Sequence, residues 1–168
     1  MSIVAENLDF FLSGGATNAD PNASLGGIIS ATEVVDNTLS NLFDEVTGDE
    51  HTAGDISYRC IYFKNSSAET AYNVKLWIES NTTGADSAIT IGLDLAGVNG
   101  TADTIADENT APDPAVTFVT ADGQANALSL GNMTAGQVYA FWIKRVITAG
   151  STPQANDTAQ LKIYVDTL

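Results

Sequence analysis

The stretch Leu128–Ile147, "LSLGNMTAGQVYAFWIKRVI", places two apolar runs on either side of a short turn that contains glycine. The second run alternates between two faces, as a β-strand does, because successive side chains of a strand point in opposite directions. The tripeptide Thr134-Ala135-Gly136 supplies the turn. The stretch therefore predicts a long central strand, entered through a glycine turn, whose apolar residues belong to the core. One face carries Tyr139, Phe141, Ile143 and Arg145, and the other carries Val138, Ala140, Trp142 and Lys144.

The same alternation recurs along the chain. It is clearest in "ISYRCIYFKN", residues 56–65, where both faces are largely apolar, so this strand is also expected in the centre of a sheet. Short strands separated by turn residues predict an all-β fold, a single antiparallel β-sandwich of immunoglobulin-like or jelly-roll type. Further strands are expected at residues 8–12, 28–34, 71–80, 87–97, 116–119, 127–133 and 159–168.

The length and the turn residues predict the domain organisation. A chain of 168 residues suits one domain with a real core. Residues 1–55 are expected to form an extended arm rich in glycine and asparagine, with an acidic lead-in, that packs on a sandwich core of residues 56–168. Within the first part, "NTLSNLFDEV", residues 37–46, is compatible with a short turn of helix or with an anchored loop.

The charge of the chain is strongly acidic and unevenly distributed. There are 21 acidic and 6 basic residues, for a net charge of −15. All basic residues lie at Arg59 or later, and residues 1–58 contain ten acidic residues. This balance disfavours binding to nucleic acid, whose phosphates it would repel. It fits solubility in a salty medium or a positively charged partner, and the sequence leaves both explanations open.

The residues needed for common catalytic and metal sites are scarce. His51 is the single histidine and Cys60 the single cysteine, so a hydrolase triad, an intramolecular disulfide and a zinc site are not expected. Cys60, within a strand, is predicted to be a small buried apolar residue. We expect no enzyme activity, no catalytic residues, no cofactor and no metal site. The acidic loops at residues 44–55 and 102–115 lack the EF-hand spacing, but they leave calcium binding open.

The N-terminal residues lack the features of a secretory signal. They contain neither a basic segment nor a long apolar run, and no apolar run in the chain is long enough to cross a membrane. We therefore expect a protein that is neither exported by that route nor inserted in a membrane.

Four long pieces of the chain carry a resemblance to a known group. They are "LSGGATNADPNASLGGIISATEV" (12–34), "NLFDEVTGDEHTAGDISYRCIYFKN" (41–65), "IADENTAPDPAVTF" (105–118) and "LSLGNMTAGQVYAFWIKRVITAGSTPQANDTAQLKI" (128–163). Together they resemble small structural proteins of the virions of tailed bacteriophages. The resemblance implies a capsid decoration protein that binds and stabilises the outer surface of the head. Association with the tail or baseplate is the alternative placement.

The resemblance also implies partners and a location. The partners would be the major capsid protein and neighbouring copies of this chain, with a homotrimer as one arrangement, and neither nucleic acid nor a membrane. The chain would be made in the host cytoplasm and would end on the exterior of the capsid.

Aromatic residues beside lysines give the candidate contact surface. Trp77 lies near Lys75, Trp142 next to Lys144, and Tyr164 near Lys162, which fits ordinary cross-strand pairing or a protein interface. A carbohydrate-binding sandwich is the rival hypothesis, and it requires Trp77 or Trp142 to face solvent. The candidate partner contacts are Phe10, Phe11, Leu12, Trp77, Trp142 and Tyr164.

Overall fold

The computed structural model describes residues 3–155 and 157–166. Within them, nearly all regular structure is strand, and the helices are short. The helices are α1 (Gly48–Ala53) and the 3₁₀ turns η1 (Ala5–Asn7), η2 (Pro21–Ala23) and η3 (Gln124–Asn126). The strands are β1 (Leu8–Ser13), β2 (Gly26–Gly27), β3 (Ile29–Glu33), β4 (Asp55–Asn65), β5 (Ala71–Ser80), β6 (Ser87–Val98), β7 (Ala102–Thr104), β8 (Leu128–Met133), β9 (Val138–Ile147) and β10 (Gln160–Asp166).

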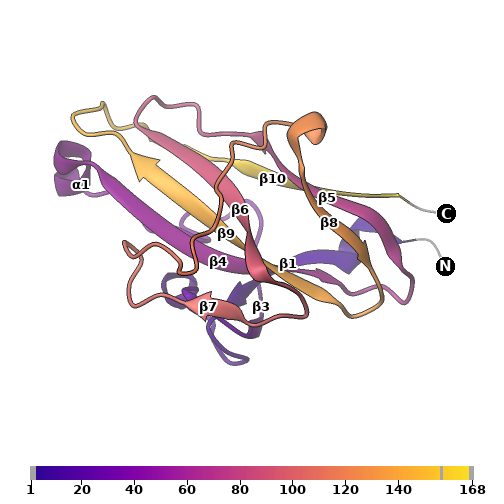
Figure 1. Ribbon diagram of the computed structural model, residues 1–168. Coiled ribbons are helices and arrows are strands. Elements are labelled where there is room, and N and C mark those ends of the chain that lie inside the picture. Colours follow the sequence, from indigo (N-terminus) through magenta and orange to yellow (C-terminus); the bar gives the residue numbers. More distant parts are fainter. Residues whose placement is uncertain (1–2, 156, 167–168) are drawn as a thin grey trace.

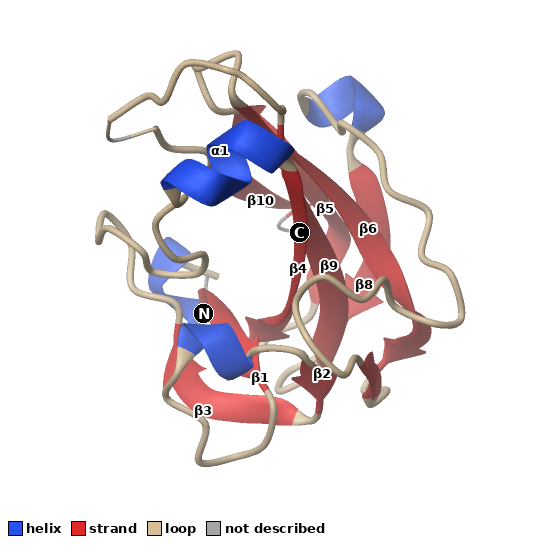
Figure 2. Cartoon of the chain, turned by 90° about the vertical axis from the view of Figure 1, so that its left-hand side faces the viewer, coloured by secondary structure: helices blue, strands red, loops and turns tan. Residues whose placement is uncertain are grey.

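Antiparallel sheets packed against each other form the molecule, so the predicted all-β sandwich is confirmed (Figure 1). The large sheet has the strand order β3-β1-β4-β9-β6, and a smaller sheet has the order β10-β5-β8. A short third ladder pairs β2 with β7. Figure 2 shows the large sheet curving from β3 and β1 through β4 toward β6, with α1 beside β4.

Strand β4 is central, as its sequence predicts, because it pairs with β1 on one side and β9 on the other. Its two faces enter different apolar clusters. Ile61 and Phe63 belong to the main core between the large and the small sheet, whereas Cys60 and Tyr62 belong to a second cluster on the opposite face. Because both faces of this strand are covered, its amino-acid sequence is a nearly continuous apolar run.

The second cluster is closed by connecting segments rather than by a sheet of its own. Leu25, Ile105 and Phe118 pack there against the outer face of the large sheet. The Tyr62 hydroxyl fastens two of these segments, since it donates to Gly27 O at 2.6 Å and accepts from Ala102 N at 2.9 Å. Burial raises the pKa of Tyr62 to about 12, so this link persists across the physiological range.

Two local expectations are corrected. The short strand expected at residues 116–119 is absent, and only Val119 forms an isolated bridge, with Ile91. The apolar residues of this segment pack instead over β6. The two backbones approach closely there, since a Cβ atom at Gly92 would lie only 2.5 Å from Thr117 O.

In residues 37–46 the anchored-loop alternative holds, and the helix comes later. Helix α1 begins after Thr47, whose hydroxyl accepts from Glu50 N at 3.3 Å while the Glu50 side chain bonds back to Thr47 N at 2.5 Å. This reciprocal capping box favours a helix start at Gly48 rather than within the preceding apolar residues.

The expected arm at residues 1–55 contributes strands to the same sheet as the expected core. Strand β1 pairs with β4 from Leu8 to Leu12, and β3 pairs with β1. The boundary at residue 55 stays a prediction. Among the described residues, no helix is long and apolar enough to span a membrane.

Candidate functional site

The connection between β3 and α1, residues 34–47, is held against the large sheet at several points, and we call it the anchored loop. Val34 N donates to Phe10 O at 2.8 Å, and Leu42 is buried in the main core. Two arginines from neighbouring strands, Arg59 of β4 and Arg145 of β9, bind its second half. The loop is therefore positioned by two inner strands of the large sheet.

Arg59 is almost completely buried, with 1% of its surface exposed. Its Nε donates to Leu42 O at 3.1 Å, and its Nη2 donates to Asn22 Oδ1 at 2.9 Å. Nη1 donates to the backbone carbonyl of Tyr58 at 3.1 Å, and Glu108 forms an ion pair with the guanidinium. A buried charge is tolerated only when it is paired and hydrogen-bonded, and Arg59 meets both conditions.

Arg145 binds the same loop two residues after Leu42, at Asp44. Its Nη1 donates to Asp44 O at 2.8 Å, and its Nη2 lies 3.3 Å from Ser57 Oγ and 3.4 Å from Asp44 Oδ1. The Phe43 ring lies 5.3 Å from the guanidinium carbon of Arg59 and 4.7 Å from that of Arg145. Guanidinium groups at this distance from a ring are attracted by its π-electrons. We call Arg59, Phe43 and Arg145 the arginine clasp.

The first half of the anchored loop presents apolar side chains to solvent. Val35 and Leu39 are 62% and 67% exposed, among the most exposed large apolar residues described. We call this first half the tip of the anchored loop. Asn41 Nδ2 donates to Val35 O at 3.0 Å, which connects the tip to the second half of the loop, where the two arginines bind. The neighbouring Asp36 is exposed and acidic. An apolar pair in an acidic setting, carried on a positioned loop, is suited to contact with another protein.

The predicted contact residues are mostly inside the molecule. Leu12 and Trp142 are 2% and 0% exposed, so neither side chain lies at the surface of the chain. Strand alternation does put Trp142 on the face opposite Phe141, but the second apolar cluster covers that face. Phe11 is also buried there, and Phe10 packs edge-on against Phe63 in the main core.

Trp77 and Tyr164 lie on the small sheet, with different exposure. Trp77 is 4% exposed and packs in the main core cluster, while Lys162 Nζ lies 5.7 Å from its ring centroid and Glu79 accepts from its Nε1 at 2.6 Å. The lysine that covers Trp77 is thus its cross-strand partner rather than Lys75. Tyr164 is 37% exposed and donates to Asp166 at 2.6 Å, so among the six candidates it is the most accessible.

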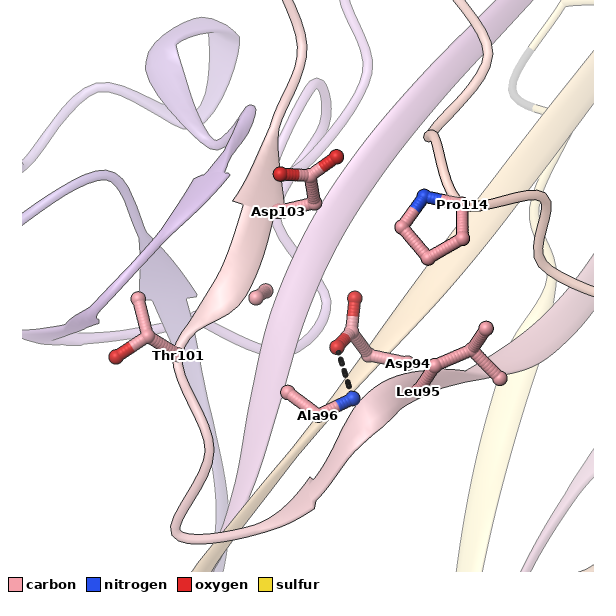
Figure 3. A pocket seen from close by; sticks show the side chains of 7 residues that line it. Asp94, Leu95, Ala96, Thr101, Asp103 and Pro114 are labelled. Carbon is pink, nitrogen blue, oxygen red and sulfur yellow. Dashed lines mark hydrogen bonds between the residues drawn. The ribbon is translucent and has the colours of Figure 1, made fainter.

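A cavity of about 490 Å³ opens between the end of β6 and β7 (Figure 3). Asp94 lines this cavity and is buried. Both of its carboxylate oxygens already accept hydrogen bonds from the protein, Oδ1 from Ala96 N and Oδ2 from Trp142 Nε1, each at 2.8 Å. Asp94 thereby fastens β6 to β9. The residues that line the cavity are Asp94, Leu95, Ala96, Thr101, Ala102, Asp103 and Pro114.

The single cysteine behaves as the sequence predicts, because Cys60 is fully buried. Burial and the nearby Asp94 carboxylate raise the pKa of its thiol well above the ordinary value. Since the thiolate is the reactive form, we expect iodoacetamide to leave Cys60 unmodified in the folded chain and to modify it in denaturant. Mass spectrometry measures this directly, and modification of the folded chain at the denatured rate would contradict the burial.

Within residues 3–155 and 157–166, no group of at least three His, Cys, Asp or Glu side chains is placed to hold a metal ion. Some polar groups of the acidic loops considered for calcium bond within the loops themselves. Asp107 accepts from Asn109 N at 3.1 Å and from the Thr110 hydroxyl at 2.8 Å, for example.

Sequence reasoning missed the arginine clasp, although one signal was available. Arg59 and Arg145 each stand within an otherwise apolar strand pattern, where a buried cation requires partners from elsewhere in the chain. Alternation alone does not identify those partners. In comparisons with known proteins, no family model, curated protein or solved structure matches the chain.

Proposed function

We propose that this chain is a structural protein of a tailed-phage virion, a decoration protein that binds and stabilises the outer surface of the capsid. One observation carries the proposal. The four sequence pieces that resemble such virion proteins meet at the arginine clasp, because Arg59 bonds to Asn22, Leu42 and Glu108, and Arg145 bonds to Asp44. The resemblance thus lies in residues that build and position a surface loop.

The exposed tip of the anchored loop is the proposed contact with the capsid protein. Val35 and Leu39 supply apolar area, and the surrounding chain up to residue 58 contains no basic residue. A complementary surface on the capsid protein would therefore be apolar at its centre and basic around it. The clasp keeps the tip in one position, which lowers the entropy lost on binding.

Quantitative mass spectrometry of purified virions tests the placement. We expect this chain in an amount equal to the major capsid protein, or in a fixed simple fraction of it, as for a protein that coats a symmetric lattice. A few copies per particle would instead favour the tail or baseplate. Absence from particles would overturn the virion proposal.

Replacement of Leu39 by aspartate tests the contact surface. We expect occupancy on capsids that lack the chain to fall at least about tenfold after re-addition of the variant, because a charge replaces an apolar contact at the centre of an interface. Leu95→Asp is the matched control, since Leu95 is similarly exposed at 65% but lies on β6. Equal binding of both variants would remove the anchored loop from the interface.

Neighbouring copies of the chain are part of the proposal, with a homotrimer as one arrangement. Analytical ultracentrifugation of the free chain and of the chain released from capsids distinguishes a preformed trimer from monomers that meet on the lattice. The carbohydrate-binding alternative lacks its aromatic contact surface, because it needs Trp77 or Trp142 at the surface and both are buried.

A further inference from the structure

Two aspartates that are distant in the sequence lie on the same side of one glycine. Asp86 precedes β6, and Asp157 belongs to the connection between β9 and β10. The β5–β6 connection and residues 148–155 lie side by side at the end of the sandwich that carries α1 (Figure 1). A Cβ atom at Gly84 would overlap Asp86 Oδ1 and would lie 2.6 Å from Gln154 Cγ and 3.1 Å from Asp157 Oδ2. Both carboxylates and the Gln154 side chain therefore pack beside the Cα of Gly84.

Asp86 is buried, and one of its oxygens lacks a partner. The residue is 4% exposed, and Oδ1 accepts no hydrogen bond from any described residue. The rest of Asp86 is held firmly, since Oδ2 accepts from Gln154 N at 3.1 Å and the backbone carbonyl accepts from Thr148 N at 2.7 Å. A buried carboxylate oxygen without a donor or a cation is costly, so it requires an explanation.

Asp157 is oriented toward the same place by the β5–β6 connection. Its Oδ1 accepts from Thr83 N at 2.8 Å, and its Oδ2 accepts from Ser87 Oγ at 3.0 Å. The Asp157 oxygen that lies near Gly84, Oδ2, is therefore positioned by a hydrogen bond from Ser87 Oγ. Ser87 Oγ adds a neutral oxygen beside it.

The charge of this pair is not balanced by a basic side chain. The ion pairs within the described residues join Arg59 to Glu108, Arg145 to Asp44 and Lys162 to Glu79. Neither Asp86 nor Asp157 takes part in them, and the chain as a whole carries a net charge of −15. A bound cation would satisfy Asp86 Oδ1 and would remove the repulsion between the two carboxylates.

The donor atoms select the kind of cation. They are all oxygens, which hard cations prefer. Asp86 Oδ1 and Asp157 Oδ2 lie within about 5 Å of each other, and two oxygens each about 2.3–2.6 Å from one Ca²⁺ span up to that distance. Ca²⁺ also accepts irregular coordination, whereas Mg²⁺ demands a near-ideal octahedron with shorter bonds.

We propose that Asp86 and Asp157 bind Ca²⁺ beside Gly84, with the Ser87 hydroxyl bonded to the Asp157 carboxylate. The ion joins the β5–β6 and β9–β10 connections and so stabilises this end of the sandwich. The proposal rests on these residues alone and stands whether or not the chain decorates a capsid.

Calcium titration of the full chain, after removal of metals by a chelator, tests the site. We expect millimolar CaCl₂ to raise the Tm by about 5 °C at constant ionic strength, and MgCl₂ to raise it less. Isothermal titration calorimetry with CaCl₂ is expected to detect binding at a one-to-one ratio. Absence of both the heat and the Tm rise would overturn the proposal.

Asp157→Asn separates a calcium ligand from a merely structural residue. In chelator we expect this variant to be as stable as the unaltered chain or more stable, because the repulsion is gone; in CaCl₂ it is expected to be less stable. Asp36→Asn removes the same charge from an exposed position and is expected to keep the full Tm rise. A full rise in Asp157→Asn would overturn the site.

Gly84→Ala probes the space between the two carboxylates without removing a charge. We expect the calcium-dependent Tm rise to be lost, because the new methyl group would overlap Asp86 Oδ1 and displace this oxygen from the site. Gly48→Ala is the matched control, since a Cβ there meets nothing within 4 Å. If Asp86→Asn does not fold, the Asp157 and Gly84 variants still decide the question. A calcium response kept in folded Gly84→Ala would contradict the assigned position.

Discussion

Replacement of Arg59 by methionine is expected to lower the free energy of unfolding by about 3–5 kcal/mol. The substitution keeps an unbranched apolar stem but removes the guanidinium that donates to Leu42 O, Tyr58 O and Asn22 Oδ1. It also leaves Glu108 without its cation. Unfolding in urea, followed by tryptophan fluorescence and by circular dichroism, measures the change.

Lys75→Met is the control for Arg59→Met. Lys75 lies half-buried on β5, and its loss is expected to change the free energy of unfolding by less than about 1 kcal/mol. Cleavage by the protease Glu-C after Glu45 adds a local measurement, because Arg59→Met should release the anchored loop and accelerate cutting there. Equal stability of the two variants would show that the guanidinium does not hold the loop.

Replacement of Trp142 by alanine is expected to cost about 3–5 kcal/mol, the range for deleting a large buried aromatic side chain. Trp142 is 0% exposed in the second apolar cluster, and its loss also removes the donor that bonds to Asp94 Oδ2 at 2.8 Å. Urea unfolding measures the cost. Capsid binding should then fall only to the extent that the fold is lost.

Two further variants separate the contribution of the Trp142 hydrogen bond from that of its buried ring. Trp142→Phe keeps most of the ring but not the indole N–H, so about 1–3 kcal/mol is expected from the unsatisfied Asp94 oxygen. Tyr164→Ala removes an aromatic ring that is 37% exposed and should be nearly neutral for stability. If Trp142→Ala folds with unchanged stability and loses capsid binding, Trp142 is a contact residue after all.

The assignments that succeeded and failed share a physical reason. Period-two alternation correctly predicted β4, β5 and β9, because the pattern is a local property of extended backbone. It placed Trp142 on the face opposite the main core, but it carried no information about what covers that face. It also placed Trp77 on an outward face, whereas Trp77 packs in the main core cluster. The expected strand at 116–119 failed for a related reason, since its apolar residues pack as a cover over β6.

The proposed sites depend on contacts between distant residues. Phe43 meets Arg59 and Arg145 only when the anchored loop folds back on the large sheet. Asp157 and Ser87, which bond at 3.0 Å, are 70 positions apart. Asp86 and Asp157 both lie outside the acidic loops at residues 44–55 and 102–115, which the sequence left open for calcium.

By itself the sequence determined the all-β class, the central strands, the buried cysteine and the acidic, basic-free first third of the chain. These follow from composition and from alternation, which act over a few neighbouring residues. Only the tertiary structure decided which aromatics are buried, where Val35 and Leu39 are exposed, and which carboxylates meet at Gly84. Burial and charge compensation depend on the segments that pack together, and an alternating pattern in one segment does not specify its neighbours.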